Sequence, residues 1–365
     1  MIERTSALLK DSAVALRDMY DETSGLFSYS SRIVDGRYVN TFEGPSVHRY
    51  TINTLAGIQR AAEHESIGWD IGAAIERFLT HQAHGVTNVG DRGLLLHVLA
   101  RTDHDDQDRL FGEIDDATAD ERASSTLNLQ EICWVILGLV TYSEQRSSDR
   151  ARALAGNLLR LIATAYGDPR APLPDFTVSR WRRGFVSFGG IAYYLMALAR
   201  YGTAFEDSAA IERFRVATAI VTGLQGPCGE WPWFIDARRG RVLDWYEVYS
   251  VHQDAMSMLF LLPALDLQIP GTHETIERSL RWIYGANELG IDMVCQEPFL
   301  IWRSIRRGAR HERAKRYLRS GLSVGLARRV DPAKLEVNTE CRSYELGWIL
   351  FAWAGRTDAA PHRPR

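Results

Sequence analysis

Residues 225–265 read QGPCGEWPWFIDARRGRVLDWYEVYSVHQDAMSMLFLLPAL, and the rest of the chain is interpreted around them. The first half holds a Gly/Pro break, tryptophans and acidic residues. The second half, from about residue 248 to 265, is apolar on nearly every side, which predicts a helix that is buried all round. Its first turns nevertheless carry Tyr249, His252, Gln253 and Asp254. Polar groups at the start of a buried helix need partners or a cavity to face, so the stretch predicts a buried helix with a candidate site at its beginning.

Helical periodicity dominates the whole chain, and alternating β-branched runs are few. A segment near 310–326 is an additional candidate helix. The pattern predicts helices near residues 3–20, 46–62, 68–82, 89–101, 106–118, 125–143, 147–166, 185–202, 207–225, 248–265, 272–287 and 339–355.

These helices alternate in character along the chain. Segments such as 147–166 and 207–225 are amphipathic, with charged residues on one face, whereas 125–143, 185–202 and 339–355 are apolar nearly all round. An amphipathic helix followed by a buried one, six times over, predicts six helical hairpins whose buried helices form a parallel inner ring. The rival architecture is an open helical solenoid, which should show a tighter repeat length.

The long links all connect an outer helix to the next inner one, near residues 21–45, 167–184, 226–247 and 288–338. In a closed ring of hairpins these links lie at one end, above the N-termini of the inner helices. Long loops on a rigid scaffold are where function concentrates, and helix N-termini present free N–H groups and positive dipole ends there.

The composition of the chain limits the classes of partner and cofactor that we expect it to bind. The formal charge of −3 favours neither nucleic acid nor an anionic membrane. The four cysteines are scattered without a CxxC pair, and no metal-ligand pattern occurs, so no cofactor or metal is expected. No apolar run reaches membrane-span length or forms a signal peptide, which makes a cytoplasmic protein the expectation. We expect one domain over residues 1–356 and a disordered tail over 357–365.

The alternating pattern resembles the (α/α)6 toroid, which is shared by six-hairpin glycosidases, sugar epimerases, polysaccharide lyases, terpenoid cyclases and protein prenyltransferase β-subunits. Gln225-x3-Gly229-x-Trp231, at the end of an outer helix, is similar to the QW-type repeat of terpenoid cyclases, and related endings occur in sugar-active toroids. The DxDD acid motif of cyclases has no match. The resemblance implies an all-α (α/α)6 toroid with its site at the N-terminal ends of the inner helices.

Four residues are candidates for catalysis. Glu131 lies among apolar residues of a predicted inner helix, where burial should raise the pKa of a carboxyl and suit it to act as a general acid. His252 is a candidate proton carrier near neutral pH, and Asp254 or Glu345 is the candidate second carboxylate. For each residue the alternative is a structural role: a buried ion pair for Glu131, a satisfied core histidine for His252, a cap for Asp254, and pairing with Arg342 for Glu345.

A second set consists of aromatic and basic residues near the predicted helix starts or on the long loops, where they are candidates to bind substrate. Tryptophans there either fix their loops or offer stacking surfaces, and arginine binds carboxylates bidentately; the alternatives are core packing and surface clusters. The candidates are Trp231, Trp233, Tyr249, His48, Arg49, Arg342, Tyr344 and Trp181. Five of the candidates, from both sets, are predicted to face one cavity: Trp231, His252, Glu131, Glu345 and His48.

Three functions are compatible with this pattern. Interleaved acidic, polar and aromatic groups favour a carbohydrate-active enzyme, a glycoside hydrolase or a sugar epimerase or lyase, with a small-molecule or oligosaccharide substrate. A terpenoid-cyclase-like enzyme should instead have a mainly aromatic, apolar pocket. A non-catalytic toroid that binds a glycan or peptide should lack paired acid and base groups.

Overall fold

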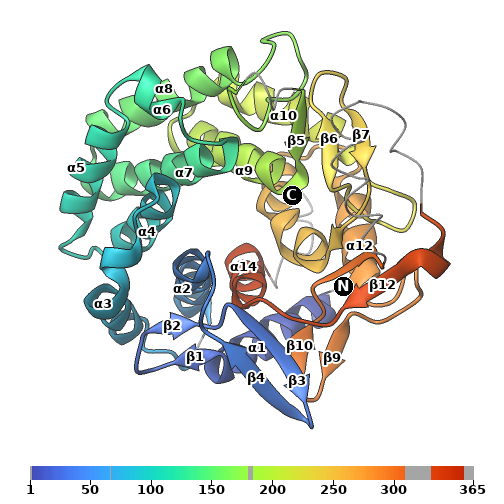
Figure 1. Ribbon diagram of the computed structural model, residues 1–365. Coiled ribbons are helices and arrows are strands. Elements are labelled where there is room, and N and C mark those ends of the chain that lie inside the picture. Colours follow the sequence, from blue (N-terminus) through green and yellow to red (C-terminus); the bar gives the residue numbers. More distant parts are fainter. Residues whose placement is uncertain (1, 66, 180–183, 309–329, 357–365) are drawn as a thin grey trace, which may run out of the picture. The chain divides into compact units, whose positions relative to one another are not determined.

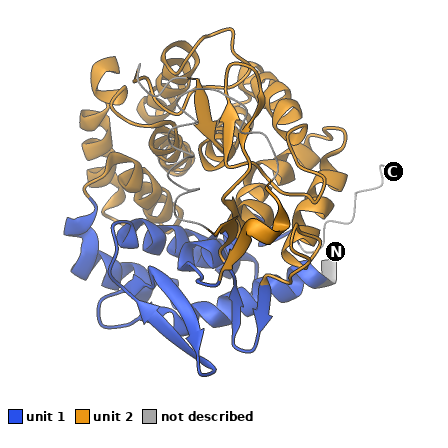
Figure 2. Ribbon diagram, turned by 45° about the vertical axis from the view of Figure 1, so that its right-hand side comes forward, with its two compact units in different colours: residues 1–86, 294–302, 339–365 blue, residues 87–293, 303–338 orange. Residues whose placement is uncertain are grey.

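The computed structural model describes residues 2–65, 67–179, 184–308 and 330–356. Its contacts divide the chain into two compact units (Figure 2). Unit 1 comprises residues 1–86, 294–302 and 339–365, and unit 2 comprises residues 87–293 and 303–338. The expected single domain over 1–356 stays a prediction. The candidate helix near 310–326 and the tail over 357–365 lie outside the described residues.

Unit 2 alternates inner and outer helices in chain order. The inner helices are buried over most of their length, because they are apolar on nearly every side. Figure 1 shows α4, α7 and α9 following one another, with α5, α8 and α10 on their outer side. The inner elements are α4 (Val89–Arg101), α7 (Leu129–Arg146), α9 (Phe188–Ala204) and the pair η3 (His252–Met256) and α11 (Met258–Asp266); the others are α5 (Gln107–Ala117), α6 (Glu121–Ser124), α8 (Asp149–Ala165), α10 (Ser208–Thr222) and α12 (Thr272–Ile283).

Unit 1 repeats this alternation at the two ends of the chain. Its inner helices are α2 (Val47–His64) and α14 (Ser343–Trp353), which pack against each other. The amphipathic helix α1 (Ile2–Asp18) packs on α14, and α3 (Ile71–Gln82), which is followed by the short η1 (Ala83–Gly85), packs on α2. The predicted alternation of amphipathic and buried helices is therefore confirmed within each unit.

Neighbouring inner helices run parallel and touch through their backbones. Gly93 of α4 lies against Val135 of α7, and one turn further the Nδ1 atom of His97 lies 2.8 Å from the Thr141 hydroxyl. A Cβ atom added to Gly93 would stand 2.5 Å from the Val135 Cα. In unit 1 the same close approach joins Gly57 of α2 to the Gly347 carbonyl of α14. A residue without a side chain is required at these crossings, because any larger one would separate the two backbones.

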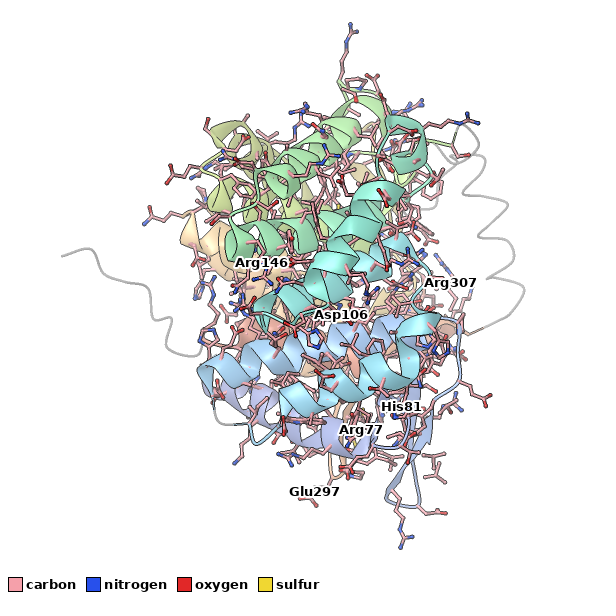
Figure 3. The ribbon with its side chains drawn as sticks, turned by 90° about the vertical axis from the view of Figure 1, so that its left-hand side faces the viewer. Arg77, His81, Asp106, Arg146, Glu297 and Arg307 are labelled. Atoms are coloured by element: carbon pink, nitrogen blue, oxygen red, sulfur yellow. The ribbon has the colours of Figure 1, made fainter. Side chains whose placement is uncertain are left out.

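Charged side chains gather on the outer surface of unit 2, as the amphipathic pattern predicted. Arg146, at the end of α7, contacts Asp103 at 3.1 Å and Asp108 at 3.2 Å, and Arg109 lies 3.3 Å from Asp106. Arg146 and Asp106 are labelled in Figure 3. These ion pairs are partly exposed, so each contributes little to stability, but they join the start of α5 to the end of α7.

Short antiparallel strands occupy the predicted long links. The sequence pattern did not predict these strands. In unit 2, Ser187 pairs with Phe234 and Ser304 pairs with Tyr249. The sheets of this unit are β5-β6-β7 and β12-β11-β8, from β5 (Phe185–Ser187), β6 (Phe234–Asp236), β7 (Arg241–Asp244), β8 (Val248–Tyr249), β11 (Ser304–Arg307) and β12 (Leu335–Asn338). Unit 1 holds two-stranded sheets from β1 (Tyr20–Asp21), β2 (Leu26–Phe27), β3 (Ser30–Val34), β4 (Arg37–Thr41), β9 (Val294–Gln296) and β10 (Phe299–Ile301).

These strands correct two predicted helix boundaries. Residues 185–187 and 248–249 were expected to be helical, but they pair with β6 and β11 respectively. The predicted helix over 272–287 also ends earlier, at Ile283. Local periodicity carries no information about a strand partner that lies about 50 or more residues away in sequence. Tertiary pairing can therefore override a helical pattern at its ends.

The Gln225-x3-Gly229-x-Trp231 motif is a structural connector. The Gln225 amide donates to the Gly229 carbonyl at 3.1 Å and to the Thr275 carbonyl of α12 at 3.0 Å. The indole N–H of Trp231 donates to the Ser279 hydroxyl at 2.8 Å. Gly229 has a φ of +93°, and a Cβ there would clash with the α12 backbone. The motif therefore joins the end of one outer helix to the next, which is a requirement of the architecture rather than of one reaction.

Two glycine substitutions test the close packing of α4 against α7. Gly93→Ala should lower the free energy of unfolding by about 1–3 kcal/mol or more, because its new methyl group meets backbone atoms of α7. Gly112→Ala is the matched control: Gly112 lies in the exposed face of α5 with no atom within 4 Å of an added Cβ, so the change should stabilise the protein by up to about 1 kcal/mol. Urea unfolding measures both. Equal effects of the two substitutions would contradict the proposed backbone contact.

Candidate functional site

A half-exposed aromatic group lies where the sheets of unit 2 meet the start of the buried helix. The rings of Trp233 and Tyr249 have centroids 4.8 Å apart, and both lie against the His252 ring, at 6.1 Å and 5.2 Å. Phe188, at the start of α9, contacts the same imidazole at 4.9 Å. Trp233 and Tyr249 retain exposed surface, whereas Phe188 and His252 are buried. We call the two partly exposed rings, Trp233 and Tyr249, the aromatic platform.

Backbone hydrogen bonds hold this platform in place. The N–H of Phe188 donates to the Trp233 carbonyl at 3.1 Å, which fixes the loop to the start of α9. The N–H of Ser250 donates to the Arg303 carbonyl at 2.9 Å, and Tyr249 pairs with Ser304 of β11. The platform therefore rests on rigid elements from three parts of unit 2.

Glu247 lies beside this platform. Its Oε1 accepts a hydrogen bond from the Ser304 hydroxyl at 2.5 Å, and its Oε2 accepts one from the Tyr249 hydroxyl at 3.2 Å. The Arg303 guanidinium lies 5.3 Å from the Tyr249 ring centroid. The two hydroxyl donors position the carboxylate. Glu247 is half-buried, so its side chain also keeps exposed surface. Such a carboxylate can transfer a proton or stabilise positive charge on a substrate held against the platform.

Glu247 is not among the predicted site residues, although it lies within residues 225–265. An extended backbone places alternate residues on one side, so an extended interpretation of residues 247–249 would have placed Glu247 and Tyr249 together. Because residues 248–265 were predicted to be helical, the proximity of Glu247 and Tyr249 was not predicted.

His252 is a buried neutral base. The side chain is 4% exposed and is surrounded by the rings of Phe188, Trp233 and Tyr249. Burial lowers the pKa of the imidazole to about 3, because the charged form loses hydration. The low pKa favours a neutral imidazole near neutral pH, and the catalytic role of His252 stays a prediction. His252 opens a π-helical turn, a rare feature that is frequent at functional sites.

Asp254 and Glu345 are fully enclosed, with exposed fractions of 0% and 1%. Burial raises the pKa of the Asp254 carboxyl well above its usual range, because the charged form loses hydration. Groups without exposed surface do not reach a substrate in solvent, and the structure therefore places both residues among the buried polar groups of the interior. Arg342, the expected partner of Glu345, pairs instead with Glu340 at 2.8 Å.

Glu131 forms a capping box at the start of α7. Its Oε2 accepts from the Asn128 backbone N–H at 2.9 Å, and its Oε1 accepts from the Asn88 side chain at 2.8 Å. The Asn128 side chain in turn accepts from the Glu131 N–H. The carboxyl is half-buried and points back to the helix start, not into the apolar surroundings that the sequence suggested. It joins the N-terminal ends of α4 and α7 and stays accessible, so its catalytic role stays a prediction.

Trp231 is a core residue. Its exposed fraction is 0%, its ring stacks on Phe188 at 4.9 Å, and its N–H is bound to Ser279. A side chain without exposed surface does not stack on a substrate from solvent, which corrects the expectation that Trp231 binds one. Trp233 and Tyr249, in contrast, retain the exposed surface that a stacking role requires. Trp181 lies outside the described residues.

The candidates of unit 1 form a separate cluster at the starts of α2 and α14. Tyr50 stacks on Tyr29 at 5.2 Å and contacts Tyr344 at 4.4 Å, and all three keep exposed surface. The Arg342 guanidinium lies 4.0 Å from the Tyr29 centroid and donates to the Tyr29 carbonyl at 2.9 Å. Arg342 is thus engaged in holding the tyrosines, so it is better placed to position them than to bind substrate.

His48 and Arg49 open α2 in the same unit. The His48 Nε2 atom lies 3.2 Å from the Gln82 side-chain oxygen, and its ring packs under Gly85 and against Phe78. His48 therefore faces the outer helix α3, and its assignment to substrate binding stays a prediction. Arg49 is half-buried beside it. That residues of both units line one cavity stays a prediction.

The described residues contain no cluster of three or more His, Cys, Asp or Glu side chains arranged to hold a metal ion. Within the same ranges, no helix has both the length and the hydrophobicity needed to cross a membrane.

No protein-family model and no curated protein matches this sequence, but solved structures match its fold over nearly the whole chain. A sugar epimerase from a ruminal bacterium has a TM-score of 0.65 at 10% identity, covering 98% of this chain and 99% of its own. Unsaturated glucuronyl hydrolase from Bacillus sp. GL1 has a TM-score of 0.62 at 11% identity, with 96% of both chains covered.

A third match is an inactive variant of the α-1,6-mannanase from Salegentibacter sp. HEL1_6 in complex with α-1,6-mannotetrose. It has a TM-score of 0.61 at 12% identity, covering 96% of this chain and 98% of its own. The fold common to these structures is the (α/α)6 toroid, which the alternation of helices predicted. The chain has the (α/α)6 toroid fold.

Because the His252 imidazole is buried, we expect the free energy of unfolding to depend on pH. Between about pH 6.5 and pH 3 the unfolded chain binds a proton at residue 252 that the folded chain does not. Stability should therefore fall as pH falls through this window, with a slope of up to about 1.4 kcal/mol per pH unit. His252→Gln removes this term, so the free-energy difference between wild type and variant should shrink as the solution is acidified.

Urea unfolding at a series of pH values measures this difference, and contributions common to both proteins cancel in it. His273→Gln is the control, because His273 is exposed on α12. A wild-type curve that runs parallel to the His252→Gln curve would show that the imidazole is not held neutral.

Proposed function

We propose that this chain is a carbohydrate-active enzyme, a glycoside hydrolase, that binds an oligosaccharide on the aromatic platform and uses Glu247 in acid–base catalysis. The observation that carries the proposal is the position of Glu247. Its carboxylate is held by the hydroxyls of Ser304 and Tyr249 at the edge of the stacking surface.

The platform suits a sugar ring for physical reasons. A pyranose has apolar C–H faces and a polar circumference, so it needs a flat aromatic surface with hydrogen-bonding groups around it. Trp233 and Tyr249 are inclined to each other by 37°, so one of the two partly exposed rings would provide the flat surface, and Tyr249 adds a phenolic hydroxyl. Glu247, Ser304 and Arg303 provide polar groups beside it. A mainly apolar pocket, which a terpenoid cyclase would need, does not account for these groups.

The reaction requires a second group besides Glu247. Glycosidases ordinarily pair a general acid with a second carboxylate that acts as a base or nucleophile. We assign this role to Glu131, which is half-buried in the first turn of α7. Asp254 is not assigned the role, since it is fully buried. The names of the structural neighbours, two hydrolases and a sugar epimerase, support the substrate class.

The test begins with a glycan array, which identifies oligosaccharides that bind the wild-type protein. Release of reducing ends from the bound glycans then measures turnover. Glu247→Gln keeps the size of the side chain but removes its titrating proton, so turnover should fall roughly 10²–10⁴-fold while binding is retained. Glu336→Gln is the matched control: Glu336 lies on β12 of the same sheet, paired with Arg306 at 2.8 Å, and its loss should leave turnover near the wild-type value.

Two further variants separate the roles. Trp233→Ala should weaken glycan binding more than it slows turnover at saturation, because it removes the stacking surface. Glu131→Gln should reduce turnover if Glu131 is the second carboxylate, and only stability if it is a cap alone. Near-normal turnover of Glu247→Gln contradicts the mechanism, and binding without any turnover favours a non-catalytic glycan-binding toroid. Conversion to an isomeric sugar without new reducing ends would identify an epimerase.

A further inference from the structure

One face of the three-stranded sheet β5-β6-β7 keeps exposed surface beside the aromatic platform. Figure 1 shows these strands next to one another in unit 2. Alternate residues of a strand point to opposite faces of a sheet, and Val186 pairs with Ile235, both fully buried, on the inner face. The other face therefore carries Phe185, Phe234 and Asp236. The two phenylalanines are half-buried, so part of this face is open to a ligand.

The two phenylalanine rings continue the aromatic platform along the sheet. The centroid of the Phe234 ring lies 5.2 Å from that of Trp233 and 5.5 Å from that of Phe185. The planes of Phe185 and Phe234 are inclined by 84°, so a ligand that packs here uses the face of a single ring. An apolar contact for a further sugar ring therefore lies one residue beyond Trp233.

A buried carboxylate fixes two arginines on the same face. Asp236 pairs with Phe185 on one side and with Arg241 on the other. Its Oδ2 atom accepts from Arg239 Nη1 at 3.2 Å and from Arg241 Nε at 3.1 Å, and its Oδ1 atom accepts from the Arg239 backbone N–H at 3.1 Å. Burial raises the pKa of a carboxyl, but the hydrogen bonds from the two arginines outweigh it and hold the pKa of Asp236 below its ordinary value.

The two arginines keep positive charge and hydrogen-bond donors at the surface. The side chains of Arg239 and Arg241 are 64% and 54% exposed, whereas that of Asp236 is 7% exposed. Among the described residues, Asp236 is the one carboxylate within 4.0 Å of either guanidinium. One carboxylate balances one of the two charges, and each guanidinium uses a single nitrogen on it. The cluster is therefore net positive and retains N–H donors that face solvent.

We propose that this face of the sheet is a subsite for an acidic sugar residue, whose ring packs against Phe185 and whose anionic group binds Arg239 and Arg241. The proposal rests on the proposed function, since it names the class of oligosaccharide that extends from the aromatic platform. Guanidinium groups bind oxyanions through paired N–H donors. The charge of the cluster therefore favours an acidic sugar over a neutral one.

The strand register supports the size of this subsite. Facing residues of antiparallel strands have Cβ atoms about 4.5–5.5 Å apart. Phe185, Asp236 and Arg241 face one another in a row across the three strands. An aromatic ring and a guanidinium group thus stand two strands apart, on either side of the carboxylate that orients the arginine. One sugar residue with an acidic substituent has the length to reach both.

The first experiment uses three probes that share one ring: glucose, glucuronate and glucose 6-sulfate. NMR follows the Nε–Hε signals of the two arginines, which are assigned by their loss in Arg239→Gln and Arg241→Gln. At least one acidic sugar should shift these signals, and glucose should not. A response to glucuronate alone identifies a carboxylate site, and a response to glucose 6-sulfate alone identifies a sulfate site. The absence of a response to either acidic sugar overturns the proposal.

Inorganic sulfate and Phe185→Leu separate a sugar subsite from a general anion site. Phe185→Leu keeps an apolar side chain but removes the ring. It should therefore weaken binding of the acidic sugar and leave the response to inorganic sulfate unchanged. An acidic sugar that binds no more tightly than inorganic sulfate, or that binds Phe185→Leu as it binds the wild type, overturns the subsite.

The second experiment uses an acidic oligosaccharide from the array and the same oligosaccharide after carboxyl reduction or desulfation. The double variant Arg239→Gln/Arg241→Gln should lower the affinity for the acidic form roughly tenfold, because two charge-assisted contacts at exposed positions are lost. Its affinity for the neutral form should stay near that of the wild type. A wild-type protein that binds both forms equally, or that binds only neutral glycans on the array, overturns the proposal.

The double variant Arg150→Gln/Arg281→Gln is the matched control. These arginines lie on α8 and α12, are 61% and 64% exposed, and each pairs with one carboxylate, Asp115 and Glu277 respectively. The control removes the same charge from other parts of unit 2, so it should bind the acidic form as the wild type does. An equal loss of affinity in both double variants would show a general effect of charge and would contradict the subsite.

The subsite and the proposed function fail separately. Turnover that depends on Glu247, without any preference for acidic glycans, would support the proposed function and overturn the subsite. Binding of an acidic glycan that depends on Arg239 and Arg241, without turnover, would support the subsite and contradict the proposed function.

Discussion

The close approach of parallel inner helices is the constraint on which the rest of the structure depends. Where α4 crosses α7, backbone meets backbone at Gly93 and Gly138, and the same occurs between α2 and α14 at Gly57 and Gly347. Helices packed this closely and in parallel bring their N-terminal ends together. Free N–H groups at those ends need acceptors, which explains why Asn88, Asn128 and Ser187 stand as caps at three successive inner helices.

The same constraint explains why the candidate site lies at this end of unit 2. The links that enter the inner helices must cross the caps, and two of them fold into strands that pair with distant segments. The resulting sheets hold Trp233, Tyr249 and Glu247 above the start of the buried helix. A π-helical turn then places His252 against these rings and next to the backbone of α9. A rigid framework of helices and sheets thus fixes aromatic, acidic and neutral hydrogen-bonding groups in one place.

The predicted site residues separate according to burial. The sequence placed Trp231, Asp254 and Glu345 at helix starts or on loops, where exposure was expected, and the structure encloses all three. Trp233 and Tyr249 keep their exposed surface, and Glu247, which was not selected, is the carboxylate that touches them through Tyr249. Residues two positions apart, such as Trp231 and Trp233, thus differ in their exposure to solvent. Which side of an irregular segment faces solvent depends on what packs against it, and periodicity carries no such information in loops.

By itself the sequence determined the fold class and the order of outer and inner helices, because a buried helix must be apolar all round and an outer one amphipathic. It also determined that the polar residues of the 225–265 stretch stand at the start of a buried helix. Only the tertiary structure decided the pairings: Ser304 reaches Glu247 across 57 positions of sequence, and Asn88 reaches Glu131 across 43. Hydrogen bonds and burial between such distant residues follow from the path of the backbone, and no local pattern encodes that path.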